Sequence, residues 1–193
     1  ARMIVFSPMD DANKAIDTMR KIHSAVEENR GATIPDWAYR DVLFMLIHYS
    51  ISAYELLEEK LTEVEKEEVY NVFYRVGIRM GLKELPSNYI EWLPIREAHL
   101  VADLQKSEFT ADLFKQYKKH LGAIRFKVLI EGQKLVCPNR VKKLLQFSDF
   151  SLLALVVPIY KLSRLMKMDG LLKGILLPSD YKAQINELDV YKG

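Results

Sequence analysis

The sequence predicts an all-α fold, a single globular domain of roughly seven to nine helices around a buried central helix. Apolar residues recur three and four positions apart along most of the chain, which is the spacing of one helix face. No Asn-Gly or Asp-Gly pair joins alternating strands, because the one Asp-Gly, Asp169-Gly170, lies between helical patterns. A length of 193 residues suits one domain, so we expect residues 1–193 to form a single helical domain.

The first two helices are expected to carry the most regular apolar faces. Asp10 or Asp11 is placed to cap a helix that runs to about Glu28. A second helix should cover about residues 37–60. It is apolar nearly all round over residues 42–51, which is typical of a central, buried helix.

Capping and terminating residues define the next two helices. Thr62 and Glu65 form a Thr-x-x-Glu capping box that begins a third helix, and Gly81 should end it. The residues expected on its inner face are Val69, Val72, Phe73 and Val76. A further helix should start near residues 87–88, with a kink or break at Pro94.

The rest of the chain also has helical periodicity. An amphipathic helix should end at Gly122, and another apolar stretch follows it and stops before Pro138. The amphipathic helix covers about residues 110–121. Further helices are expected over residues 140–147, 150–166 with a bend at Pro158, and 179–188.

Charge and cysteine content limit the functional classes. The net charge of +2 gives no argument for nucleic-acid binding. Residues 123–193 carry 12 basic and six acidic side chains. This excess of positive charge fits either a basic surface exposed to solvent or peripheral contact with a membrane surface. The single cysteine excludes an internal disulfide and fits a cytoplasmic location. The chain opens with Ala1, so we expect that part of the natural N-terminus precedes it.

Familiar catalytic motifs are missing from the sequence. There is no G-x-G-x-x-G, P-loop or G-x-S-x-G segment. The residues three positions before the four histidines are Arg20, Met45, Arg96 and Tyr117, so the Glu-x-x-His motif of di-iron bundles fails at each histidine. One cysteine cannot form a zinc knuckle.

Two histidines lie on apolar helix faces, which is an unusual place for an imidazole. His23 has Met19 one turn before it, and His48 has Phe44 one turn before it and Met45 beside that residue. A buried neutral imidazole needs a partner at each ring nitrogen, because an unpaired nitrogen costs about 1–3 kcal/mol. Each of them can be a core histidine with internal hydrogen bonds. An apolar, methionine-lined slot with one imidazole also suits haem.

Four short motifs follow one another in the order of a known family. They are His-x-x-Val at His23–Val26, the apolar run "LIHYSISAYELL" with His48, Leu-Thr-x-x-Glu at Leu61–Glu65, and the Leu85-Pro86 pair. Over about residues 10–122 the chain resembles the largely bacterial oxygenase family that contains latex-clearing rubber oxygenase and the endoplasmic-reticulum cleavage oxygenase of mycophenolic acid biosynthesis. Leu46 stands where this family usually has tryptophan.

The resemblance implies a haem b-dependent oxygenase that acts on a small apolar, isoprenoid- or lipid-like substrate with O2. It makes His23 the proximal iron ligand, and we expect His48 to be a catalytic residue. The residues expected around the cofactor are Met19, Arg20, Phe44 and Met45, with Arg20 placed to pair with a haem propionate. Two alternatives stay open: a non-catalytic helical pocket that binds a hydrophobic ligand without haem, and a metal site that uses His99 or His120.

Overall fold

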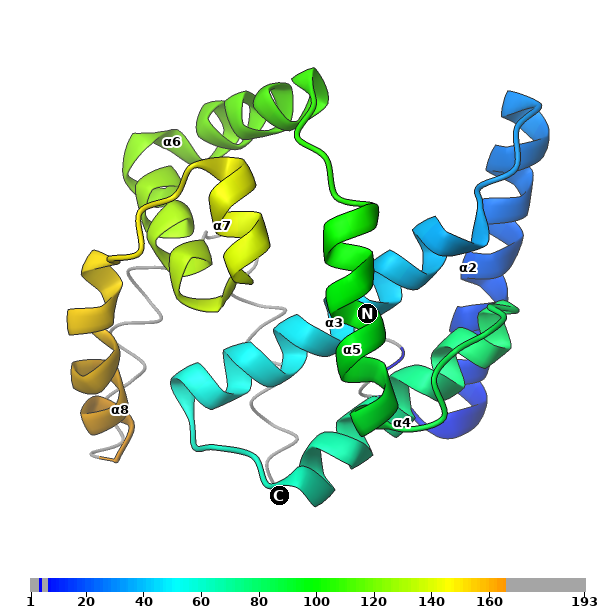
Figure 1. Cartoon of the computed structure of the whole chain (residues 1–193), viewed down its shortest axis with the longest axis horizontal. Coiled ribbons are helices and arrows are strands. Elements are labelled where there is room, and N and C mark those ends of the chain that lie inside the picture. Colours follow the sequence, from blue (N-terminus) through cyan, green and yellow to red (C-terminus); the bar gives the residue numbers. More distant parts are fainter. Residues whose placement is uncertain (1–3, 5–6, 166–193) are drawn as a thin grey trace. The chain divides into compact units, whose positions relative to one another are not determined.

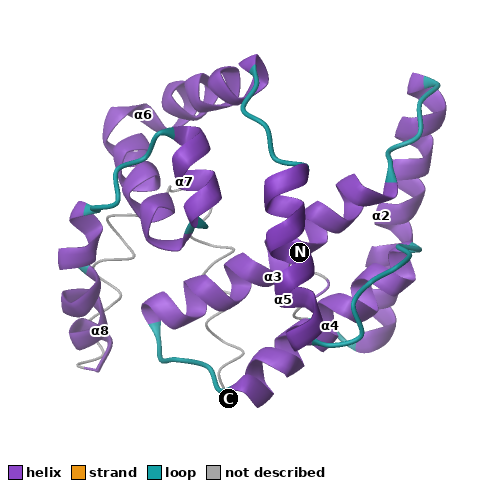
Figure 2. Ribbon diagram, in the orientation of Figure 1, coloured by secondary structure: helices purple, strands orange, loops and turns teal. Residues whose placement is uncertain are grey.

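The computed structural model describes residue 4 and residues 7–165, and within them it contains helices and no strand (Figures 1 and 2). The all-α prediction is therefore confirmed. The α-helices are α2 (Met9–Arg30), α3 (Asp36–Leu57), α4 (Glu63–Met80), α5 (Tyr89–Ala102), α6 (Glu108–Val136), α7 (Asn139–Leu145) and α8 (Val157–Leu165), with a 3-10 helix η1 (Leu152–Leu155). The helix expected over 179–188 lies outside the described residues, as do Asp169 and Gly170.

The chain divides into two compact units, each of which is described by itself. One spans Ala1–Glu55 and Glu59–Gln105, and the other spans Leu56–Glu58 and Lys106–Gly193. The single domain expected over 1–193 stays a prediction.

Helix α3 supplies half of the core of the first unit. Its buried residues are Leu43, Phe44, Ile47 and Ile51, and Ile47 is fully buried. Helix α4, the turn after it and helix α5 complete the core with Tyr70, Leu82, Tyr89 and Trp92. The expectation of an all-round buried helix is wrong for one face of α3, because Val42, Met45 and Leu46 are 54%, 46% and 41% exposed.

The predicted helix ends are mostly confirmed. Thr62 and Glu65 form the reciprocal capping box at the start of α4, and Gly81 ends that helix in the left-handed conformation at φ 88°. Asn88 caps α5 through its side chain, and the helix continues through Pro94, so a break at Pro94 is wrong.

Two details of the predicted helices differ in the structure. Helix α2 begins after Pro8, so the aspartates at positions 10 and 11 lie in its first turn, where they complement the helix dipole, rather than at the cap. Val72 of α4 is 40% exposed and does not face the core as expected.

The second unit is organised around α6. Gly122 has φ 74° and ψ 169°, which interrupts the helix where its end was predicted. The Glu131 carboxylate accepts a hydrogen bond from the Leu152 backbone N–H at 2.7 Å, and the Ser151 hydroxyl donates to the Glu131 carbonyl at 2.8 Å. These bonds fasten η1 to α6. Among the described helices, none combines the length and apolarity needed to cross a membrane.

Candidate functional site

Helices α2, α3 and α4 enclose an apolar pocket of about 260 Å³ within the first unit. Helix α2 contributes Met19 and His23 to its lining. The remaining lining residues are Ile34, Ala38, Tyr39, Val42, Leu43, Leu46, Val76, Gly77, Met80 and Leu82. Apart from His23 and Tyr39, all of these side chains are hydrocarbon, thioether or hydrogen, so the pocket favours an apolar ligand.

His23 is the one imidazole in this lining, and one of its nitrogens has no partner. Its Nδ1 is buried and makes no hydrogen bond among the described residues. The ring stacks on that of Tyr39, with centroids 5.4 Å apart and planes at 29°. A buried nitrogen without a partner costs about 1–3 kcal/mol, which makes it a candidate to bind a ligand atom.

Glu27, one turn after His23, fixes the neighbouring Tyr39. Its Oε1 accepts a hydrogen bond from the Tyr39 hydroxyl at 3.3 Å and from the Ile34 backbone N–H at 2.8 Å. Burial and the Glu27 carboxylate raise the pKa of Tyr39, so this phenol stays protonated as the donor at neutral pH. Sequence reasoning missed both residues, although the spacing of four between His23 and Glu27 places them on one face of the helix.

Gly77 of α4 leaves room for two leucine side chains at the wall of the pocket. A Cβ at this position would lie 2.7 Å from Leu43 Cδ2 and 2.7 Å from Leu85 Cδ1. These distances are shorter than van der Waals contact, so any larger residue must displace both leucines.

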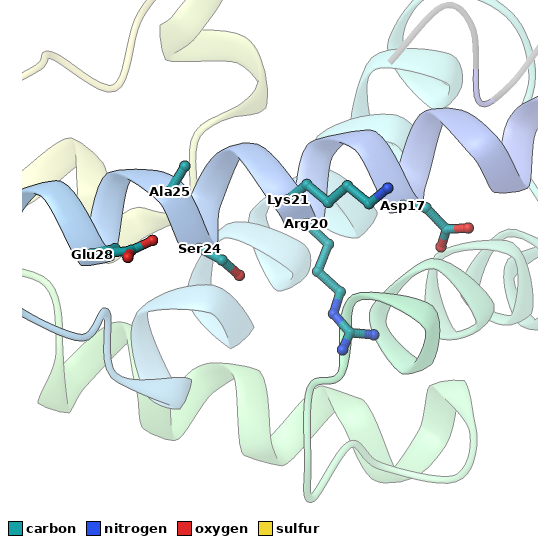
Figure 3. Close-up of a pocket in the computed structure, with 6 residues that line it drawn as sticks. All are labelled: Asp17, Arg20, Lys21, Ser24, Ala25 and Glu28. Carbon is teal, nitrogen blue, oxygen red and sulfur yellow. The ribbon is translucent and has the colours of Figure 1, made fainter.

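Only two of the six predicted site residues, Met19 and His23, line this pocket. Arg20 lines a separate polar hollow of about 490 Å³ with Asp17, Lys21, Ser24, Ala25 and Glu28, all on α2. In Figure 3, Arg20 and Ser24 extend to one side of α2, while Ala25 projects to the opposite side.

The three predicted residues on α3 are not among those that line the pocket. Phe44 belongs to the core, where its ring meets the Trp92 ring edge-on at 6.1 Å. Met45 is 46% exposed. His48 is absent from the pocket lining and has the Ser52 hydroxyl 3.4 Å from each ring nitrogen and the Tyr49 ring at 5.1 Å.

The comparisons with known proteins identify the family of the chain. A comparison with curated proteins and a comparison with solved structures gave no match. The family model described as "ER-bound oxygenase mpaB/B'/Rubber oxygenase, catalytic domain" matches residues 2–167. This match covers most of the chain, including α2, α3, α4 and the whole apolar pocket. The chain therefore belongs to the mpaB/rubber oxygenase catalytic-domain family.

Proposed function

We propose that this protein is a haem b-dependent oxygenase that uses O2 to oxidise a small apolar substrate, with His23 as the residue that would hold the iron. The family is of the oxygenase type. The observation that carries the proposal is the buried, unpartnered Nδ1 of His23 in an otherwise apolar pocket.

The donor chemistry of the pocket suits haem. Haem iron takes one imidazole nitrogen as a proximal ligand and, when bound, supplies the activation of O2 that the side chains alone lack. The His23 Nδ1 makes no competing hydrogen bond among the described residues, and iron would have to displace the atoms that cover it to reach it. Apolar surroundings suit both a porphyrin face and an isoprenoid- or lipid-like substrate.

The size of the pocket sets a condition on the proposal. A volume of about 260 Å³ lies just below the 300–1,000 Å³ usual for drug-sized ligands. Val42 and Leu46 line the pocket and are 54% and 41% exposed, so this side meets solvent. A porphyrin is larger than this pocket, and it would extend out of the pocket on the side of Val42 and Leu46.

The protein's own residues hold and orient the ligand nitrogen. Tyr39 covers one face of the His23 ring, and Glu27 holds the Tyr39 hydroxyl, so the two together restrict the rotation of the imidazole. The aliphatic lining would bind the substrate through apolar contact. His48 does not line the pocket, so the proposal gives it no contact with the substrate.

Reconstitution with haemin tests the proposal. The wild-type chain should give a Soret band with one haem per chain, and His23→Ala should lose it. His120→Ala is the matched control, because His120 is an exposed histidine on α6, and this variant should keep the band. A wild-type chain that binds no haemin, or a His23→Ala spectrum equal to that of the wild type, refutes the assignment. Lipid that co-purifies with colourless protein would instead support the non-catalytic pocket.

A further inference from the structure

A second polar centre lies between α3 and the end of α5, away from the residues that line the apolar pocket. The Nδ1 atom of His99 is 2.7 Å from Asp41 Oδ1 and 3.0 Å from Asp103 Oδ2. One ligand atom from each of these three residues lies within 4.8 Å of the others. Asp41 belongs to α3, His99 to the last turn of α5, and Asp103 is the C-cap of α5.

The three side chains are partly buried and held in place. They are 18–23% exposed, so each still reaches solvent on one side. The Phe44 ring meets the His99 ring edge-on with centroids 5.2 Å apart, which fixes the plane of the imidazole.

A single proton on His99 Nδ1 cannot make good hydrogen bonds to both the Asp41 and the Asp103 carboxylates. Nδ1 carries either one proton or one lone pair, so it can donate one well-aligned hydrogen bond, yet two carboxylates converge on it. The C-terminal end of α5 adds its own partial negative charge. Arg40 is the nearby cation, and its guanidinium pairs with Glu84 at 2.9 Å. The cluster therefore has an excess of acceptors over positive charge.

We propose that Asp41, His99 and Asp103 bind a divalent transition-metal ion through Asp41 Oδ1, His99 Nδ1 and Asp103 Oδ2, with water in the remaining positions. Zn²⁺ and Mn²⁺ accept mixed imidazole and carboxylate ligands, and metal–ligand distances of about 2.0–2.2 Å are compatible with ligand atoms about 3 Å apart. The ion takes the place of the Nδ1 proton and contacts both carboxylates at once. This site uses none of the residues of the apolar pocket, so it stands independently of the proposed function.

Isothermal titration of the chelator-treated full chain with ZnCl2, and separately with MnCl2, tests the site. We expect one ion of at least one of the two metals per chain. Asp103→Asn and His99→Asn should weaken this binding by about 100-fold or more, because each removes one of three protein ligands. His23→Ala should leave it unchanged.

Matched controls separate this site from adventitious binding. Asp112→Asn and His120→Asn make the same chemical changes at exposed positions of α6 and should bind as the wild type does. Circular dichroism establishes that each variant is folded. If His99→Asn does not fold, the affinity of Asp103→Asn for the metal tests the site. The proposal is wrong if neither metal binds up to about 1 mM. It is also wrong if folded Asp103→Asn retains wild-type affinity.

Discussion

The Tyr70 hydroxyl illustrates how one buried polar atom connects two segments of the first unit. Tyr70 is 1% exposed, and its hydroxyl donates a hydrogen bond to the Pro86 carbonyl in the turn that precedes α5. Burial raises the pKa of Tyr70 well above its ordinary value of 10. The folded state therefore keeps this proton in alkaline solution, where the unfolded chain loses it.

Tyr70→Phe should lower the free energy of unfolding by about 1 kcal/mol near pH 7, because it removes the hydrogen bond to Pro86. Since the folded pKa is raised, the stability that the Tyr70 proton contributes is present below pH 10 and falls as the pH rises further. By pH 11 ionisation in the unfolded state should lower wild-type stability by about 1.4 kcal/mol, while the variant escapes this loss. Urea unfolding at both pH values measures the difference, and a gap that stays constant contradicts the burial argument.

Of the three predicted site residues on α2, Met19 and His23 line the apolar pocket and Arg20 does not, whereas none of the three on α3 lines it. His23 and Met19 are four residues apart, so helical periodicity alone predicts that they share the face of α2 that lines the pocket. Helix α3 is apolar on several faces, so periodicity alone did not reveal which face borders the pocket. Its residues 39, 42, 43 and 46 line the pocket, whereas Phe44 lies in the core and Met45 near solvent. Tyr39 and Glu27 escaped prediction because their contact joins two helices across a loop.

Among the helices, a missing side chain at Gly77 of α4 makes room for the Leu43 side chain of α3. Gly77 lies inside α4, where glycine is intrinsically less favourable than alanine by about 0.5–1 kcal/mol. Its buried position against Leu43 and Leu85 explains why a small residue fits there. Gly77 and Leu43 both line the apolar pocket, so a shift of the Leu43 side chain would change the shape of the pocket.

Gly77→Ala should therefore destabilise the protein by about 1–2 kcal/mol despite the gain in helix propensity, because the new methyl group overpacks two leucines. Gly132→Ala is the matched control, since a Cβ there would find its nearest neighbour, Leu153 Cδ1, at 3.9 Å. The control should be neutral or stabilising by up to about 1 kcal/mol. Thermal or urea unfolding compares the two variants. Equal effects would show that the two leucine side chains move aside at little cost, and would contradict the overpacking argument.

Helix ends were the best-predicted features at this scale, and the reason is local. The capping box of α4 and the left-handed Gly81 depend on residues within one turn of each other, so the sequence contains all the information. The continuation of α5 through Pro94 was not predicted. Proline disfavours a helix interior by about 3 kcal/mol, and the burial of Tyr89, Trp92 and Arg96 on the same helix offsets this preference.

At the scale of the whole molecule, the described part of the second unit has a small core. Its buried residues are Glu131, Cys137 and Ser151, whereas the first unit buries a continuous cluster of aromatic and aliphatic side chains. A unit with so little buried apolar surface has little stability of its own. The single domain expected from the length of the chain stays a prediction, and it requires that the chain unfold in one cooperative transition.

Two spectroscopic probes test this cooperativity. Both tryptophans, Trp37 and Trp92, belong to the first unit, so their fluorescence reports on that unit, while far-ultraviolet circular dichroism reports on helices of both. The two urea-unfolding curves should coincide. A loss of circular dichroism at lower urea concentrations than the fluorescence change would show that the second unit unfolds separately, and would overturn the single-domain prediction.

Fold class was the most predictable property of the molecule as a whole. Helical periodicity extends over most of the chain and does not depend on how the helices pack, so the all-α architecture followed from the sequence. The division into two units did not follow from it, because no change in composition marks residues 103–107.

Chemical rescue of a His23 variant shows most directly whether the His23 nitrogen itself binds the iron. His23→Gly leaves space beside Tyr39 that free imidazole can fill, so haemin-reconstituted His23→Gly should regain the wild-type absorption spectrum when imidazole is added. Recovery of the wild-type Soret position, with no comparable change in His120→Gly, is the result that we predict. A His23→Gly protein that matches the wild type before imidazole is added would contradict the central claim that His23 is the axial ligand.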